Sequence, residues 1–108
     1  MGQIFSEPES NLRGDLGRQA FEAFGNQVTL LEAILDRNSE LGITLPNANN
    51  SVHIYLRNFA LSGEEFICIL GVDTKGRNVR LIQHVTQLSA MLVEVPKLGK
   101  IAFRIGSA

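Results

Sequence analysis

The segment from Phe66 to Val72 places the tightest limit on how this chain folds. Its residues are apolar at both odd and even positions, which is typical of the central strand of a sheet. Turn-forming residues follow at 73–77, where Gly76 supplies the positive φ that a tight hairpin needs. Residues 78–82 then return as a strand, so the sequence predicts an antiparallel hairpin at this point.

The residues before this hairpin also follow the period of two that strands have. Apolar and polar residues alternate over 52–57, and the alternation slips at Asn58, where we expect a β-bulge or a bend. A short strand is expected still earlier, at 43–45. The sequence therefore predicts an antiparallel meander of three to four strands.

Two other segments repeat their apolar residues at steps of three and four, as amphipathic helices do. The first spans residues 12–36, and the second spans residues 85–95 after the meander. One last short strand is expected at 101–105, and polar residues 1–10 are expected to form a flexible N-terminal arm. The order is that of an α+β fold: an N-terminal helix, the meander, a second helix and a short C-terminal strand.

Composition limits the function as well as the fold. The 108 residues fit one α+β domain, which we place at 11–108, and a net charge of −1 argues against a nucleic-acid partner. No apolar stretch approaches the ~20 residues of a membrane helix. Cys68 is the single cysteine, which fits a cytoplasmic location. Residues 1–6 match the pattern for N-myristoylation at Gly2, but no second membrane anchor accompanies them.

One string of the sequence carries a family resemblance. Residues 81–89 read Leu-Ile-Gln-His-Val-Thr-Gln-Leu-Ser, and a Val-Pro pair and a closing Arg104-Ile105-Gly106 follow in order. Over residues 25–106 the chain resembles a bacterial family catalogued as a domain of unknown function, whose meander ends in such a string. The resemblance implies a bacterial cytoplasmic protein and brings no reaction with it.

The same string holds the best candidate binding site. Gln83, His84 and Gln87 cluster where a strand is expected to give way to a helix, and a histidine with two amides can orient a polar ligand or move protons. Such side chains also satisfy the unpaired backbone groups of a junction, and we favour this structural role. Arg104 is the fourth candidate; the family usually has two arginines before its Ile-Gly pair, and Phe103 replaces the first.

The sequence offers no arrangement for catalysis, a metal or a cofactor. The two histidines lack the spacing of metal ligands, and neither a phosphate loop nor a nucleophile with its base can be placed. We therefore expect a non-enzymatic protein–protein interaction or regulatory module, of which an accessory or phage-associated inhibitor is one variant. The alternative is a small ligand-binding or catalytic domain centred on His84. Because two helices leave part of so apolar a sheet uncovered, we also expect a homodimer.

Overall fold

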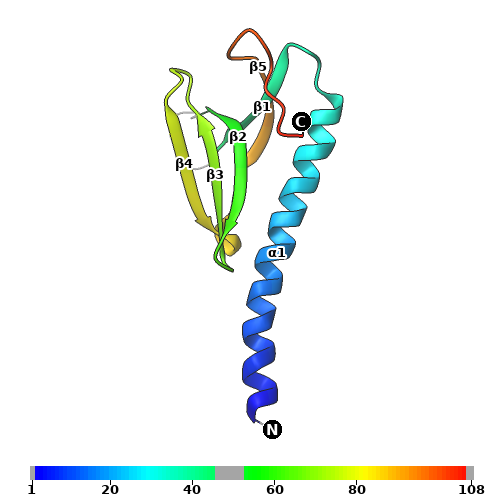
Figure 1. Cartoon of the computed structure of the whole chain (residues 1–108), viewed down its shortest axis with the longest axis vertical. Helices are drawn as coiled ribbons and strands as arrows, with labels where there is room; N and C mark the ends of the chain where they lie inside the picture. Colours follow the sequence, from blue (N-terminus) through cyan, green and yellow to red (C-terminus); the bar gives the residue numbers. More distant parts are fainter. Residues whose placement is uncertain (1, 46–52, 107–108) are drawn as a thin grey trace.

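One long helix and a single five-stranded sheet make up the fold (Figure 1). The computed structural model describes residues 2–45 and 53–106, with side chains from residue 15 onward except that of His53. The elements, in chain order, are α1 (Gly2–Ile34), β1 (Ser39–Thr44), β2 (His53–Ser62), β3 (Phe66–Val72), β4 (Asn78–His84), the short 3-10 turn η1 (Val85–Gln87) and β5 (Met91–Pro96).

The predicted meander is confirmed by β2, β3 and β4. All pairings in the sheet are antiparallel, and the strand order is β4-β3-β2-β1-β5, so β2 rather than β3 is the middle strand. The register shifts between Leu56 and Asn58, which confirms the predicted irregularity in β2. Gly76 has a φ of 79° in the loop between β3 and β4, as the hairpin requires.

The second predicted helix, at 85–95, is wrong. Only the one-turn η1 follows β4, and the chain then forms β5, which pairs along the whole of β1. In this pairing Leu92 lies opposite Ile43 on the core side of the sheet, whereas Val95 lies opposite Glu40 on the other side. The residues that suggested a single helical stripe therefore face opposite sides of the sheet.

The predicted C-terminal strand at 101–105 is also wrong. The segment is irregular, and its backbone amides donate to carboxylates instead of to a neighbouring strand. Glu40 of β1 accepts from the amide of Phe103, and Glu32 of α1 accepts from that of Ile105. These bonds satisfy the backbone without a sheet.

The first helix is longer at its start than the sequence predicts. It begins at Gly2, so the backbone of residues 2–10 is helical where we expected a loose arm; the flexibility of that arm stays a prediction. A helix of 33 residues is about 50 Å long. Its N-terminal part consequently projects past the sheet, and the molecule measures 60 × 32 × 19 Å (Figure 1). Among the described residues, no helix has both the length and the apolar character needed to cross a membrane.

The core lies between α1 and one face of the sheet. Val28 of α1 is 2% exposed, and Phe24 and Leu31 pack beside it, as the helical spacing predicts. The helix closely approaches the β2–β3 turn, where a Cβ on Gly17 would overlap the carbonyl oxygen of Glu64. The remaining buried apolar side chains come from three strands: Leu41, Ile43, Ile54, Leu56, Ile67 and Ile69.

Candidate functional site

His84 lies at the end of β4, where it caps η1. Its Nδ1 accepts from the backbone amide of Thr86 (3.2 Å) and lies 2.7 Å from the Thr86 hydroxyl, while its Nε2 lies 3.0 Å from a carboxylate oxygen of Glu65. Because Nδ1 accepts, the proton is assigned to Nε2, which donates to Glu65. The ring also packs edge-on against Phe66, with 5.3 Å between centroids. Each polar atom of the imidazole thus has a partner inside the chain.

The contacts of His84 support a structural role. A hydroxyl, an imidazole and a carboxylate follow one another here, the order that hydrolases use to activate a nucleophile. However, Nδ1 also holds the Thr86 amide, and none of the three hollows described below is lined by His84. A catalytic group needs a place for substrate beside it. The arrangement therefore favours a role in holding the strand-to-turn junction.

The other two residues of the predicted cluster do not converge with His84. Gln83 pairs with Ile67 in the register and faces the core side, whereas His84 pairs with Phe66 and faces the opposite side. The Oε1 atom of Gln83 is buried without a hydrogen-bond partner among the described residues. Gln87 is exposed in η1. These residues are close in sequence but do not form one site. Gln83 and His84 point to opposite faces because successive residues of a strand do so.

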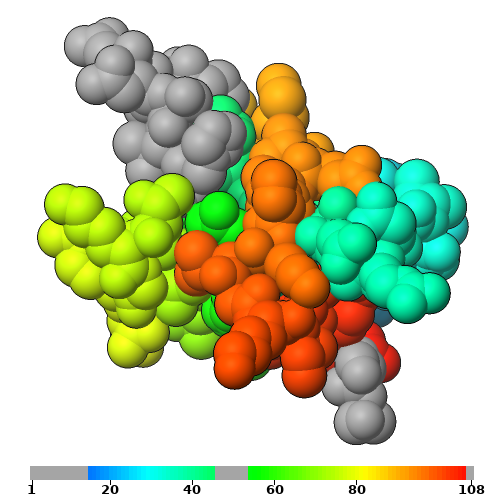
Figure 2. Space-filling model, turned by 90° about the horizontal axis from the view of Figure 1, so that it is seen from above, coloured from blue at the N-terminus to red at the C-terminus, as the bar shows by residue number. Residues whose placement is uncertain are grey.

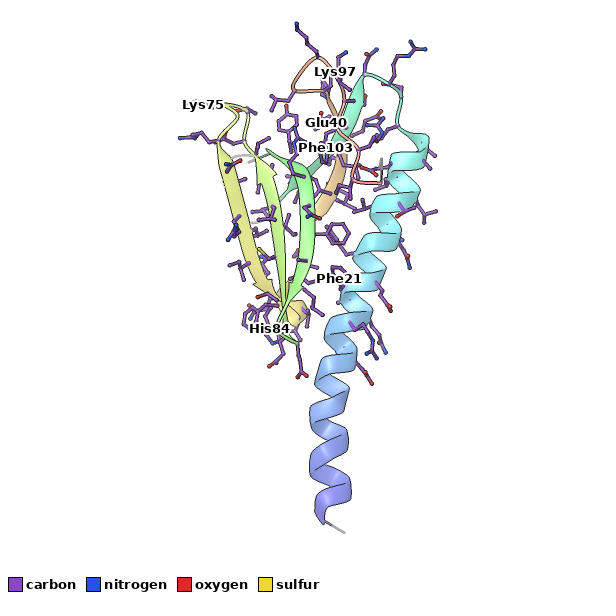
Figure 3. All side chains as sticks on the ribbon, in the orientation of Figure 1. Phe21, Glu40, Lys75, His84, Lys97 and Phe103 are labelled. Carbon is purple, nitrogen blue, oxygen red and sulfur yellow. The ribbon has the colours of Figure 1, made fainter. Side chains whose placement is uncertain are left out.

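Arg104 follows Phe103, which lies at the end of the sheet opposite His84 (Figure 3). Its guanidinium donates to three backbone carbonyls: those of Ser39 (2.7 Å), Asp36 (2.8 Å) and Phe103 (3.0 Å). These bonds fasten the C-terminal segment to the connection between α1 and β1. Its donors are used mainly within the fold rather than presented to a ligand.

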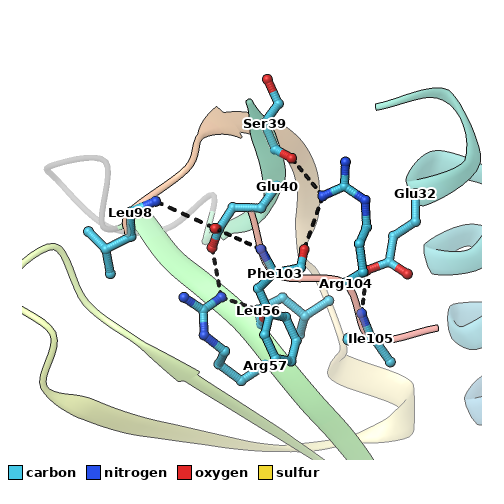
Figure 4. A network of polar contacts seen from close by, with 9 residues as sticks. All are labelled: Glu32, Ser39, Glu40, Leu56, Arg57, Leu98, Phe103, Arg104 and Ile105. Atoms are coloured by element: carbon cyan, nitrogen blue, oxygen red, sulfur yellow. Dashed lines mark hydrogen bonds and ion pairs between the residues drawn. The ribbon is translucent and has the colours of Figure 1, made fainter. Parts of the chain in front are cut away.

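A buried ion pair that the sequence analysis missed lies beside Arg104 (Figure 4). Glu40 is only 1% exposed, and one of its oxygens accepts from Arg57 at 2.7 Å. The other oxygen accepts from the backbone amides of Phe103 (3.2 Å) and Leu98 (3.4 Å). The Arg57 guanidinium lies 4.6 Å from the centroid of the Phe103 ring, a cation–π contact. The only signal in the sequence was an acidic residue in an apolar strand.

Glu32 completes this polar network from the side of the helix. Its carboxylate accepts from the amides of Ile105 (2.7 Å) and Gly106 (3.0 Å). Figure 2 looks onto this end of the molecule and shows the orange and red C-terminal segment between the β3–β4 loop and the end of α1. The C-terminal segment is therefore held across the end of the sheet by three side chains: Glu32, Glu40 and Arg104.

Two shallow hollows adjoin Arg57. One, of about 490 Å³, is lined by residues of the C-terminal segment including Leu98 and Ile101. The other, of about 470 Å³, is lined by residues of β3 and β4 including Leu70 and Arg80. A third, of about 260 Å³, lies between Glu32 and Arg104.

Within the part of the chain that the structure describes, no group of His, Cys, Asp and Glu is arranged to hold a metal ion.

The side of β3 and β4 that faces away from α1 is partly exposed. In β3, Ile67 and Ile69 are 0% and 1% exposed, whereas the alternate residue Phe66 is 44% exposed. On β4, Ile82 is 58% exposed. The register places Cys68 beside Ile82 and Leu70 beside Arg80 on this side. We define the open face as Phe66, Cys68, Leu70, Arg80 and Ile82.

Comparison with known proteins adds no family to these observations. No protein-family model, no curated protein and no solved structure matches the chain. The resemblance drawn from residues 81–89 therefore stays a prediction. The functional argument rests on the fold and on the surfaces that it exposes.

Proposed function

We propose that this chain is a non-enzymatic protein-interaction module that binds the apolar surface of a partner protein through the open face. One observation supports the proposal above the others: Phe66 and Ile82 are 44% and 58% exposed on adjoining strands of one sheet face. Single exposed apolar side chains are ordinary, but a contiguous group of them indicates a contact surface.

The surroundings of the open face have the composition of a binding surface. Phe66, Cys68 and Leu70 form an apolar row along β3, and Ile82 widens the row on β4. Arg80, on the same side of β4, places a charged group beside this apolar row. An apolar centre with a polar rim is the usual anatomy of a protein–protein interface.

Covering the open face with a partner protein also lowers the free energy. Apolar surface removed from water contributes about 25 cal/mol per Å², so covering a half-exposed aromatic ring and an isoleucine contributes roughly 2–4 kcal/mol. The same residues contribute less to folding than their neighbours Ile67 and Ile69, which α1 already covers.

Site-specific photo-crosslinking tests the proposal. A photoreactive phenylalanine analogue replaces Ile82 in the full chain, which is then irradiated in a bacterial extract and as pure protein. Ala23, exposed on α1, is the matched control position. We expect discrete adducts of defined mass from position 82, absent from position 23 and lost when Phe66→Glu is added. The same adducts from both positions, or none from position 82, would overturn the proposal.

A further inference from the structure

We infer that the partner on the open face is a second copy of this chain, with the strands of the two copies running in opposite directions. The inference rests on the proposed function and names the protein that occupies the surface. A two-fold axis between the two sheets, perpendicular to the strands and near Ile69, produces this arrangement. An interface of this kind is formed by the same patch on both copies.

Charge segregation along the strands favours this arrangement. One end of the sheet carries Lys75 and Arg77 in the β3–β4 loop and Lys97 after β5, and Asp73 of the same loop pairs with Arg77. Lys75 and Lys97 mark that end in Figure 3, and His84 marks the opposite end. The opposite end carries Glu64 and Glu65 in the turn that precedes β3. Two copies stacked face to face in opposite directions bring each basic end to an acidic end, whereas copies in the same direction bring like charges together.

The charges that would meet across this interface are unused within the chain. Lys75 and Glu64 have no side-chain ion pair or hydrogen bond within the described residues. By contrast, Arg77 is paired with Asp73, and Glu65 with His84. Free charges of opposite sign at the two ends of one apolar face are therefore available to a second copy.

The row of apolar side chains is self-complementary about the same axis. With the axis near Ile69, Phe66 of one copy lies over Val72 of the second copy, and Cys68 lies over Leu70. The turn at Glu64 then lies over the loop that holds Lys75. Apolar side chains therefore meet apolar ones along β3, and the charged ends flank them.

The size of the surface sets the strength of the expected dimer. The two strands of the open face, each of seven residues, cover roughly 10 × 23 Å, which is less than half of a standard interface on each partner. We therefore expect a reversible dimer with a dissociation constant in the micromolar range rather than a permanent one.

A charge-swap experiment tests this arrangement by sedimentation of the pure chain from about 1 to about 500 μM. Glu64→Lys and Lys75→Glu each create two repulsive pairs, so each variant alone is expected to dimerise about tenfold more weakly. The double variant, and an equimolar mixture of the two single variants, restore the attraction and the dimer. Matching circular dichroism melts control for folding. A double variant and a mixture as weak as the single variants would overturn the inference.

The single cysteine gives an independent test of proximity. Packed sheets lie about 10 Å apart, so a short bismaleimide is expected to join Cys68 of two copies near the axis. We expect a product of twice 11.9 kDa that disappears with Cys68→Ser and weakens in Glu64→Lys. A monomer at every concentration, with no such product, would overturn the inference. If Ile82 then crosslinks a different protein, the proposed function survives without the self-association; if it crosslinks nothing, both fail.

Discussion

Two acid–base pairs lie at opposite ends of the sheet and differ mainly in burial. Glu40 and Arg57 are 2.7 Å apart, with side chains 1% and 25% exposed. Glu65 and His84 are 3.0 Å apart, with side chains 42% and 30% exposed. Each pair joins strands or turns that are distant in sequence. The comparison teaches that similar hydrogen-bond geometry predicts little about energy, because water replaces a lost partner at the exposed pair and not at the buried one.

The two ends also differ in what covers them. The C-terminal segment closes the Glu40 end by donating two backbone amides to the carboxylate. Among the described residues, no comparable segment covers Phe66, which lies beside His84 and is itself 44% exposed. One end is therefore specialised for holding the fold together, and the other leaves the surface on which we place the interaction.

The largest expected effect breaks the buried pair. Glu40→Ala removes the carboxylate that accepts from the Arg57 guanidinium and from the amides of Leu98 and Phe103. Removing one partner of a buried ion pair costs about 3–5 kcal/mol of unfolding free energy. Urea unfolding of the variant measures this loss.

Two further variants show that the loss belongs to the pair. Glu40→Gln keeps an acceptor oxygen and is expected to lose less stability than Glu40→Ala. The double variant Glu40→Leu with Arg57→Leu removes both charges and is expected to be less destabilised than Glu40→Ala alone. A Glu40→Ala protein that unfolds at the same urea concentration as the wild type would contradict our account of this end.

A smaller effect is expected at the exposed pair. His84→Ala removes the acceptor for the Thr86 amide and the bond to Glu65, and we expect a loss of about 1 kcal/mol. His84→Asn keeps an N-cap acceptor and should recover most of it. Thermal melts compare the three proteins. An unchanged melting temperature in His84→Ala would support the alternative in which His84 serves a ligand or a reaction.

The smallest effect concerns Asp73 in the β3–β4 loop, whose side chain is 17% exposed. Hydrogen bonds from the backbone amide and side chain of Arg77, and from the amide of Lys75, hold the pKa of its carboxyl below the ordinary value of 3.8, against a smaller opposing effect of burial. A lowered folded-state pKa contributes stability above pH 3.8, and that contribution disappears as the pH falls through the lowered value. The wild type should therefore lose more stability than Asp73→Asn between about pH 5 and about pH 2. Equal losses in the two proteins would show that the loop bonds do not stabilise the fold.

The meander was predictable because its signals are local. The alternation in β2 and β3, the slip near Asn58 and the glycine of the hairpin each depend on residues a few positions apart. The core stripe of α1 was predictable for the same reason. The exposed sheet face was expected only in general terms, since the apolar pattern of Phe66–Val72 does not distinguish a face covered by a helix from one left open.

The segment after the meander shows why a correct pattern led to a wrong element. Val85, Leu88 and Leu92 do pack against the core, as the helical spacing suggested. They do so from η1, from the connection after it and from β5, not from one helix. The free edge of β1 needs a hydrogen-bonding partner, and β5 supplies it. That requirement arises from a strand some fifty residues earlier and is invisible in a short window.

The candidate site also combines features that local sequence predicts with features that depend on distant contacts. The sequence by itself determined the alternating strands, the hairpin loop and the helix stripe, because backbone preferences and side-chain periods act over neighbouring residues. Only the tertiary structure decided that Gln83 and His84 point apart, that Glu40 meets Arg57, and that the C-terminal segment closes one end of the sheet while Phe66 and Ile82 stay exposed. Those outcomes depend on contacts between distant segments, whose energies are set by burial, and burial exists only once the whole chain has packed.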